Sequence, residues 1–331
     1  VHDYIRKRVE DLGEQIVDMS DKEFGEEFHK LTFGQAIKQK ILADYRLVCF
    51  AVTNDEIKGS IDKRTLLALE DAGITDARHI GAMIGLAKAI NKHSLSKILT
   101  FHRSIKNAKR IAEGDNPESL ISISKAFLGK LKLKRKIWSR WITAEKTSSQ
   151  RETIFQTFED LPRDVVGLIS NCQCLGEGVD IPELDGVAFI DPRKSQIDII
   201  QAVGRVIRKK DRKGTIVIPV FTDKDESTEE QIEKSEFSNL WYVIRALRAH
   251  DEVLAEELDA LRTKLGKRVS RSTGKIVLPS KLILDIPSEI SSDFENERPQ
   301  CILLLNMYSS LLLNPSQIPS EYAIYPPYHN H

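Results

Sequence analysis

The chain has 331 residues, of which 41% are hydrophobic and 30% charged, and its 49 basic and 49 acidic side chains give a formal net charge of +0. The length suffices for two domains, and the composition excludes a fibrous repeat, a disulfide-dense miniprotein and a chain disordered throughout. No run of about 18 apolar residues occurs, which excludes a membrane-spanning helix. The four cysteines are too few and too scattered for a disulfide framework, show no metal-ligand spacing, and indicate the reducing cytoplasm.

The first 64 residues predict an alternation of helix and strand that ends in a polar linker at 53–64. The sequence begins with Val rather than Met, and its periodic pattern is already under way at the first residues. We therefore expect a fragment of a longer protein. Ser20 and Glu23 have capping-box spacing and predict the start of a helix. The other predicted helices cover 3–12 and 33–42, and the predicted strands cover 15–19 and 45–52, the second apolar enough to be buried on both faces.

From residue 65 to residue 222 the pattern alternates regularly between helices and strands. Strands separated by helices of this length predict right-handed crossovers and a parallel sheet, an α/β fold. The predicted helices are 79–92, 104–113, 149–158 and 198–208, and the predicted strands are 97–101, 141–144, 164–170, 186–190 and 214–220.

The composition changes after Phe221. Residues 223–236 are acidic, and residues 237–267 predict one long amphipathic helix with an apolar stripe that includes Trp241, Leu254 and Leu261. Residues 268–331 show no clear period and receive no assignment.

The most informative helix carries Gln201, Gly204, Arg205 and Arg208 at spacings that place them on one face. Arginine is rarely buried without a negative partner, so two guanidiniums beside a glycine are unusual among apolar neighbours. A planar guanidinium binds phosphate oxygens bidentately, and Gly204 leaves room for close approach. This face therefore predicts contact with a phosphate chain.

Three segments resemble motifs of superfamily-2 helicases, and they occur in the order found in that family. Gln201-x-x-Gly204-Arg205-x-x-Arg208 is similar to motif VI, residues 177–182 (Glu-Gly-Val-Asp-Ile-Pro) to motif V, and residues 97–103 to motif IV. The Asp-Pro-Arg at 191–193 and the segment from Trp241 to Asp251 resemble bacterial helicases of the type ISP restriction-enzyme kind.

The resemblance implies a motor of two RecA-like lobes with ATP and Mg²⁺ in the cleft between them, acting on DNA. It implies that residues 1–64 are the end of the first lobe with a linker, and that residues 65–222 are the second RecA-like lobe. Residues 223–267 would then be an acidic linker and amphipathic helix, outside the two lobes.

The resemblance also assigns roles to single residues. Arg205 and Arg208 would be the catalytic arginine fingers that neutralise charge on the γ-phosphoryl group. Gly178, Asp180, Gln201 and Gly204 would contact the nucleotide. The residues implied to face the nucleic-acid backbone are His102, Arg103, Asn171 and Cys172, although many relatives have Thr where Asn171 and Cys172 stand.

The phosphate-binding motif of the first lobe is missing from the sequence. No Gly-x-x-x-x-Gly-Lys-Ser/Thr occurs in the 331 residues. Asp55-Glu56 superficially resembles a Walker B box, but its position favours a solvated linker. We therefore expect the Mg²⁺ ligands to come from a first lobe elsewhere, upstream or in another chain, and the chain alone not to hydrolyse ATP.

A basic segment with interleaved aromatics spans residues 128–141 and includes Lys132, Lys134 and Lys136. Such a pattern suits a groove that follows a phosphate backbone. The alternative is a solvated amphipathic helix with no ligand.

The sequence thus predicts the C-terminal half of an ATP-dependent DNA helicase or translocase. Two alternatives remain open. One is a non-enzymatic DNA-binding module, and the other is a subunit of a motor whose Walker motifs lie on another chain.

Overall fold

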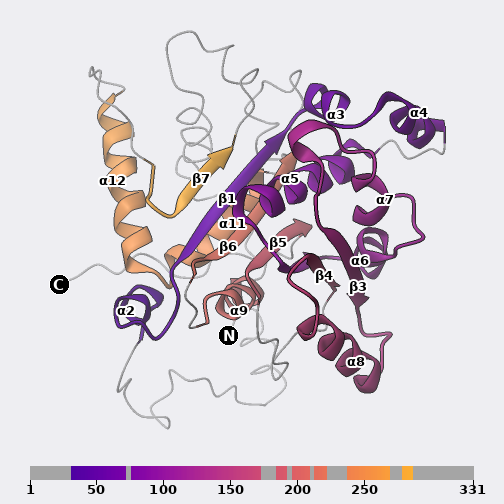
Figure 1. Cartoon of the computed structure of the whole chain (residues 1–331). Helices are drawn as coiled ribbons and strands as arrows, with labels where there is room; N and C mark the ends of the chain where they lie inside the picture. The colour runs from indigo at the N-terminus through magenta and orange to yellow at the C-terminus, as the bar shows by residue number, and fades with distance from the viewer. Residues whose placement is uncertain are drawn as a thin grey trace, which may run out of the picture.

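The computed structural model describes residues 31–71, 76–172, 184–191, 196–208, 212–221, 237–268 and 278–285. Their centre is a seven-stranded sheet in the order β3-β4-β2-β5-β6-β1-β7 (Figure 1). Every registered pair is parallel, which confirms the predicted α/β class. The strands are β1 (Tyr45–Val52), β2 (Lys97–His102), β3 (Lys136–Ile142), β4 (Val165–Asn171), β5 (Gly186–Asp191), β6 (Gly214–Phe221) and β7 (Leu282–Asp285).

Helices cover both faces of the sheet, as buried parallel strands require. One hydrophobic cluster joins the sheet to α8, α9, α11 and α12, and a second cluster joins the other face to α3, α5, α6 and α7. The helices are α2 (Phe33–Lys38), α3 (Asn54–Ser60), α4 (Lys63–Asp71), α5 (Ala77–His93), α6 (Ile105–Ala112), α7 (Leu120–Ser124), α8 (Ser148–Glu159), α9 (Gln196–Val206), α11 (Phe237–Arg248) and α12 (Glu252–Arg268).

Short polar side chains fix where several helices begin. Each cap accepts a hydrogen bond from the backbone amide three residues later, which satisfies a donor that the first turn leaves unpaired. The caps of this kind are Thr32, Thr53, Asp76, Ser104, Ser119 and Thr147.

Strand β1 belongs to the same sheet as the strands that follow it. It pairs with β6 over its full length, from Tyr45 opposite Gly214 to Val52 opposite Phe221, and with β7 on its other side. The prediction that residues 45–52 end a first lobe is therefore wrong, because backbone hydrogen bonds make β1 part of the sheet predicted only from residue 65 onward.

The stretch predicted as a polar linker is helical. Residues 54–60 form α3, which Thr53 caps, and α4 begins at Lys63. Glu56 lies in the first turn of α3 and forms an ion pair with Lys88 of α5, so Asp55-Glu56 is not a solvated linker. The prediction failed because a short half-exposed helix and a loop have similar polar composition.

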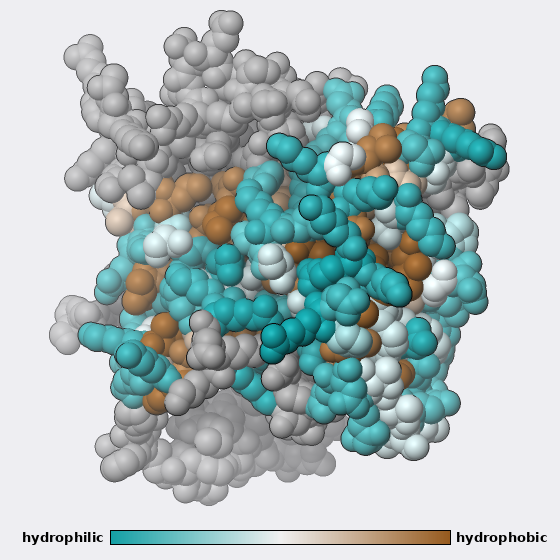
Figure 2. Space-filling view, viewed as in Figure 1, coloured by the Kyte–Doolittle hydropathy of each residue, from teal (hydrophilic) through white to brown (hydrophobic). Residues whose placement is uncertain are grey.

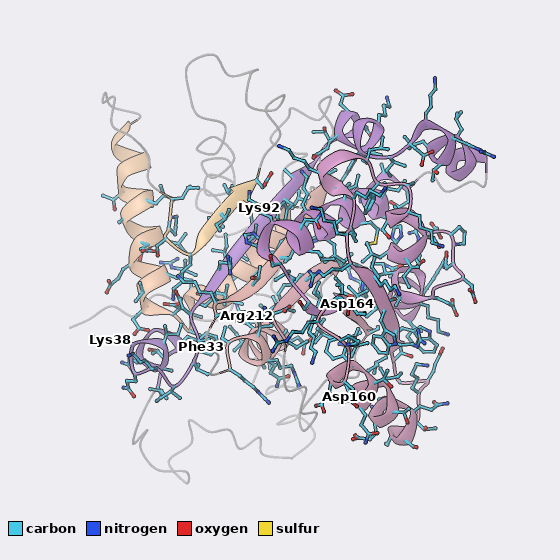
Figure 3. All side chains as sticks on the ribbon, viewed as in Figure 1. Phe33, Lys38, Lys92, Asp160, Asp164 and Arg212 are labelled. Atoms are coloured by element: carbon cyan, nitrogen blue, oxygen red, sulfur yellow. The ribbon has the colours of Figure 1, made fainter. Side chains whose placement is uncertain are left out.

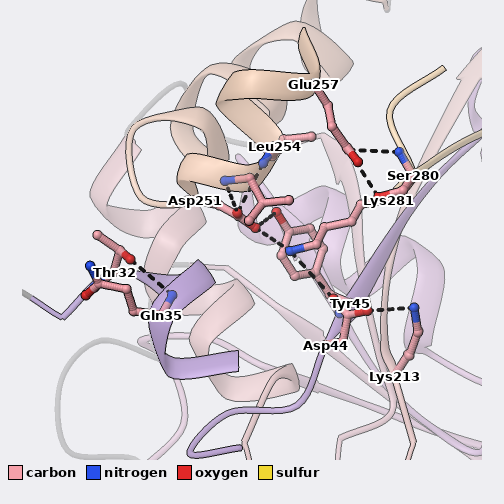
Figure 4. Close-up of polar contacts among 11 residues, drawn as sticks. Thr32, Gln35, Asp44, Tyr45, Lys213, Asp251, Leu254, Glu257, Ser280 and Lys281 are labelled. Atoms are coloured by element: carbon pink, nitrogen blue, oxygen red, sulfur yellow. Dashed lines mark hydrogen bonds and ion pairs between the residues drawn. The ribbon is translucent and has the colours of Figure 1, made fainter. Parts of the chain in front are cut away.

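The predicted long helix at 237–267 is two helices. The chain turns at Asp251, whose side chain caps α12 by accepting hydrogen bonds from the amides of Val253 (3.1 Å) and Leu254 (3.2 Å) (Figure 4). The apolar stripe continues across this turn, because Leu247 and Leu254 are both buried against the sheet.

The tail without an assignment contributes a strand. Leu282–Asp285 forms β7, which pairs with β1 from Leu47 opposite Leu282 to Phe50 opposite Asp285. Figure 1 shows β7 beside β1, next to the long α12.

The basic segment at 128–141 is not a helix along its length. It begins with a 3₁₀ turn at Gly129–Leu131 and then enters β3, which starts at Lys136, five residues before the strand predicted at 141–144. Strand β3 lies at one edge of the described sheet and pairs with β4.

One face of the described residues is largely hydrophilic. In Figure 2, hydrophilic side chains cover most of the face turned to the viewer, and hydrophobic ones lie in separate patches between them. No helix of the described part of the chain is long and apolar enough to cross a membrane. The two helices and the strand predicted before residue 31 and the acidic segment at 223–236 lie outside the described residues.

Candidate functional site

The carboxyl ends of β2, β4 and β5 lie at one edge of the sheet, where ligands of open parallel sheets usually bind. Arg103 follows β2 and is exposed, with its Nε 3.8 Å from Oδ1 of Asp191, the last residue of β5. Asn107 on α6 donates a hydrogen bond from Nδ2 to the other oxygen of Asp191 at 2.9 Å. Arg103 is therefore oriented by Asp191 but presented to solvent.

His102 does not face the surface that its predicted role requires. Its side chain is 3% exposed, and its Nε2 lies 2.9 Å from Oγ1 of Thr100. Burial lowers the pKa of His102 to about 3, so the imidazole is neutral near pH 7. A buried neutral ring offers no charge to a phosphate, so the structure does not support a direct backbone contact by this side chain.

Asn171 and Cys172 end β4 and are also buried, each with 2% exposed. Asn171 lies opposite Phe101 of β2 and Ile142 of β3 in the sheet, and the amide of Cys172 donates to the carbonyl of Ile142 at 3.2 Å. Their side chains therefore lie beneath the surface of this edge. Arg103 is the exposed member of the group.

The predicted nucleotide-contact helix is α9. Its buried residues include Ile199, Val203 and Arg205, and Arg205 is 8% exposed. Gln201 and Gly204 are half-buried, and a Cβ added to Gly204 would meet no atom within 4 Å. Gly204 thus faces open space, which fits a position that a ligand can approach.

Arg208 lies beyond the end of α9 rather than on it. The helix ends at Val206, and Arg208 is exposed in an antiparallel bridge with Leu42. The amide of Ala43 donates to the carbonyl of Ile207 at 2.8 Å, which fixes this exit from the helix. The prediction of one helical face from Gln201 to Arg208 is therefore wrong at its last position.

Two carboxylates that sequence reasoning missed hold residues 212–214, the segment that leads into β6. Asp185 is 2% exposed and accepts hydrogen bonds from Arg212 (2.6 Å) and from the amides of Ser96 (2.8 Å) and Lys97 (3.0 Å). These contacts join the starts of β2 and β6, at the amino edge of the sheet. Figure 3 labels Arg212 beside α9.

The second carboxylate is Asp44. It forms an ion pair with Lys213 (2.6 Å), and its carbonyl accepts a hydrogen bond from the amide of Gly214 (2.8 Å). Burial alone would raise the pKa of Asp44, but hydrogen bonds from Lys213 and the Tyr45 amide, with the charge of Lys281, leave it below its usual value. Asp44 therefore stays ionised and ties the end of this segment to the start of β1.

Three lysines of the basic segment that were predicted to contact nucleic acid lie at the amino edge as well. Lys132, Lys134 and Lys136 are exposed, and Lys136 starts β3 opposite Val165, the first residue of β4. Between them, Arg135 donates to Oγ of Ser96 at 2.7 Å. These lysines and Arg103 therefore lie at opposite edges of the sheet and do not form one continuous site.

The structure thus separates the predicted residues into two groups. Arg103 lies at the carboxyl edge, whereas Arg208 lies beside Leu42 and Ala43, which precede β1 at the amino edge. Strand β6 alone has 8 residues, so the two edges are about 26 Å apart at 3.3 Å per residue. Gly178 and Asp180 lie outside the described residues.

Comparisons with known proteins agree with these motifs. Residues 81–210 match the helicase conserved C-terminal domain family. The probable helicase A859L of African swine fever virus (isolate Pig/Kenya/KEN-50/1950) is 34% identical over 112 residues, which are 33% of this chain and 12% of that protein.

Among solved structures, the ATP-dependent type ISP restriction-modification enzyme LlaBIII bound to DNA has a TM-score of 0.67 at 25% identity, covering 88% of this chain and 19% of that chain. A fragment of a putative HsdR subunit of a type I restriction enzyme from Vibrio vulnificus YJ016 has a TM-score of 0.41 at 19% identity, covering 66% of this chain and 39% of that one. The chain therefore spans 12% of the viral relative and 19% of the restriction enzyme. The predicted resemblance to superfamily-2 helicases, including the type ISP kind, is confirmed.

Proposed function

We propose that this chain, which contains a helicase C-terminal domain at residues 81–210, is the second motor lobe of an ATP-driven translocase or helicase that moves along DNA. In this role it binds no nucleotide by itself. It supplies arginines to an ATP whose phosphates and Mg²⁺ are held by a first lobe that carries the Walker motifs.

The observation that carries the proposal is the separation of the two groups of predicted residues. A motor that couples ATP hydrolysis to movement needs one surface for the nucleotide and another for the track. The amino edge offers Arg208 and Gly204, and the carboxyl edge offers Arg103. One rigid sheet lies between them, so a change at one edge can be transmitted to the other.

Arg208 is the better candidate for the arginine finger. It is exposed beyond the end of α9, so its guanidinium can reach a phosphate that another lobe holds, whereas Arg205 is 8% exposed. A guanidinium placed on the γ-phosphoryl group neutralises charge that develops in the transition state, which raises the rate of hydrolysis about a thousandfold or more. Arg205 then has a structural role in α9, the helix that precedes Arg208.

The support for a nucleotide lying against α9 comes from Gly204. The space in front of its Cα is open, and Gln201 is half-buried one turn earlier on the same helix. A phosphate or ribose could approach the backbone there without steric conflict. Mg²⁺ would be held by the first lobe, because the Walker motifs are absent from this sequence.

DNA is the proposed track because the restriction enzyme with the similar structure is described as bound to DNA. The exposed Arg103 at the carboxyl edge is the group that would contact a phosphate there. Contacts of this kind are independent of sequence, as a translocase requires.

The deciding experiment measures DNA-stimulated ATP hydrolysis with the first lobe present, either in the longer protein or in a mixture with a copurifying chain that carries Walker A. We expect Arg208→Ala to abolish the DNA-stimulated turnover and to leave DNA binding unchanged. Normal turnover in this variant would refute the assignment of the amino edge to ATP.

Because Walker A is absent from the 331 residues, one alternative function is a DNA-binding module that does not bind ATP. The same preparation distinguishes it. If DNA affinity is salt-dependent, no first lobe can be found and added nucleotide has no effect, the alternative is correct. If ATPase activity appears only when a Walker-bearing chain is added, the motor is assembled from two subunits.

A further inference from the structure

A group of cations surrounds Trp141, near the end of the edge strand β3. The ammonium nitrogen of Lys146 lies 3.6 Å from the centroid of the Trp141 ring, and that of Lys109 lies 4.6 Å from it. Trp141 comes from β3, Lys109 from α6 and Lys146 from the turn before α8. We call these three residues the indole cluster.

The positive charge of the indole cluster is only partly balanced. Glu145 forms an ion pair with Lys109 (2.6 Å), and exposed Arg140 lies near by, 5.2 Å above the ring of Trp138. Partial burial and the charges of Lys109 and Arg140 lower the pKa of Lys146, against the opposing effect of Glu145 and of the more distant Glu113. Glu145 therefore pairs with Lys109, and Lys146 lies among more cations than its two neighbouring carboxylates balance in number.

The indole cluster lies close to the carboxyl edge of the sheet, where Arg103 is exposed. Trp141 stands opposite Ser170 in the pairing of β3 with β4, and β2 is the next strand after β4. Two strand spacings amount to about 10 Å. Lys106 and Lys109 are three residues apart on α6, which places them on one side of that helix, and Arg103 lies just before its N-cap, Ser104.

We propose that the indole cluster, together with Lys106 and Arg103, binds the sugar-phosphate backbone of a nucleic-acid strand. The inference rests on the proposed function for the assignment of the carboxyl edge to the track, and it adds the path that the strand takes, along α6 to the end of β3. The basic segment at Lys132–Lys136 lies at the other edge and is not part of this path.

The chemistry of the indole cluster suits a phosphate better than a packing role. A ring face attracts cations, but two ammonium groups on one ring repel each other, so the arrangement gains from an anion that both can bind. A phosphate diester carries one negative charge and several acceptor oxygens, and lysine donates up to three hydrogen bonds. Trp141 keeps both amines in place, which lowers the entropy lost when the strand binds.

The test is a fluorescence anisotropy titration of the full chain with a labelled single-stranded oligodeoxynucleotide at several salt concentrations. The variant is Lys109→Gln with Lys146→Gln, which keeps part of each aliphatic stem and removes both charges. We expect the Kd to rise about tenfold or more, because two charge-assisted contacts are lost. The slope of log K against log salt should fall by about 1.4, since each single-strand phosphate contact contributes about 0.7.

The matched control is Lys132→Gln with Lys134→Gln, which removes two exposed charges at the amino edge. We expect it to bind like the unchanged chain. Trp141→Leu, with a melting curve to verify folding, should weaken binding while leaving both charges in place, and Trp141→Phe should restore most of it. Competition by inorganic phosphate distinguishes a site for isolated phosphate ions from one that requires a strand.

Several results would overturn the inference. These are an unchanged salt slope in the Lys109/Lys146 variant, an equal loss in the Lys132/Lys134 control, displacement of the oligonucleotide by equimolar inorganic phosphate, or no binding by the unchanged chain. Arg103→Ala separates this inference from the proposed function. If this variant weakens binding and the Lys109/Lys146 variant does not, the carboxyl edge remains the track and the indole cluster is rejected.

Discussion

Arg205 and Arg208 belong to one sequence motif but occupy different environments. Arg205 lies within α9 and is 8% exposed, and Arg208 is exposed beyond the helix end. Removing a buried side chain leaves a cavity, whereas removing an exposed one does not. We therefore expect Arg205→Ala to lower the free energy of unfolding by about 2 kcal/mol and Arg208→Ala to change it by less than about 0.5 kcal/mol.

Urea unfolding of the two variants of this chain checks that difference. Arg212→Ala is a useful comparison, because it removes an exposed guanidinium from buried Asp185 and should cost more than Arg208→Ala. Equal destabilisation by Arg205→Ala and Arg208→Ala would mean that both side chains pack in the core, and Arg208 could then not reach a phosphate held by another lobe.

His102 makes the stability of the chain sensitive to acid. Burial, with a smaller effect from His79, lowers the pKa of His102 to about 3, below the value near 6.5 in the unfolded chain. Between these values the unfolded state binds a proton that the folded state does not, so the stability present above pH 6.5 is lost as the pH falls. At pH 5 the loss from this group is about 2 kcal/mol, at 1.4 kcal/mol per pKa unit.

The measurement is the free energy of unfolding of the chain and of His102→Gln at pH 7 and pH 5. We expect the difference between the two pH values to be about 2 kcal/mol smaller in the variant. Some acid sensitivity should remain, because burial also lowers the pKa of His93 to about 4. If both proteins lose the same stability, His102 is solvated in solution and its predicted contact with nucleic acid should be reconsidered.

At the scale of elements, one buried carboxylate attaches α12 and β7 to the sheet. Asp251 is fully buried and accepts hydrogen bonds from the hydroxyl of Tyr45 (2.7 Å) and from Nζ of Lys281 (2.6 Å), while it caps α12 (Figure 4). These three residues come from β1, the start of α12 and the turn before β7. Burial and the neighbouring carboxylate raise the pKa of Tyr45, so its hydroxyl remains a donor.

We expect Asp251→Ala to destabilise the chain by about 4 kcal/mol, because it removes a helix cap and leaves the buried ammonium of Lys281 with only Asp44, 3.6 Å away, as a carboxylate partner. Asp259→Ala is the control, since Asp259 lies on the same helix in an exposed pair with Arg248 (2.8 Å). That change should cost less than about 1 kcal/mol. Thermal unfolding of both variants, and of Asp251→Ala with Lys281→Met, measures these effects.

The double variant decides the cause. If the buried charge of Lys281 causes most of the lost stability, the added Lys281→Met should restore part of that stability. If the double variant is as unstable as Asp251→Ala alone, loss of the cap and of the Tyr45 hydrogen bond is the main effect.

Elements with long apolar runs were predictable, and short ones were not. Strands β1, β2, β4, β5 and β6 lie within two residues of their predicted bounds, because apolar runs between turn residues are specific to buried strands. Strand β7 has only four residues and lies in a region without period, so its pairing with β1 decides its conformation. The break between α11 and α12 at Asp251 was not predicted, because the apolar residues keep the same helical spacing before and after it.

The candidate site was predictable where a motif carries it. Arg103 and Arg208 come from motifs and are exposed, as their roles require. Asp185 and the indole cluster were missed because their contacts join residues that are far apart in sequence, such as Asp185 with Lys97 or Trp141 with Lys109. The spacing of residues close together in the sequence carries no information about such a contact. His102 was misjudged because sequence gives no measure of burial at a strand end.

On the scale of the whole molecule, the sheet keeps two sets of contacts apart. Arg103 lies at the carboxyl edge with Asp191, and Arg208 lies at the amino edge with Leu42. Effects of substitutions more than about 10 Å apart with no shared partner usually add within about 0.5 kcal/mol. In the absence of ATP, each edge of this chain should therefore respond to substitution independently of the other.

We expect Arg103→Ala to weaken binding of a labelled single-stranded oligonucleotide by this chain about fivefold, which corresponds to about 1 kcal/mol for one exposed phosphate contact. Arg208→Ala should leave the Kd unchanged, and the double variant should match Arg103→Ala within about 0.5 kcal/mol. Anisotropy titrations of the four proteins at one salt concentration provide the comparison. A double variant much weaker than Arg103→Ala would mean that the strand reaches the amino edge as well. The two edges would then share one ligand, and the division into a track side and a nucleotide side would be wrong.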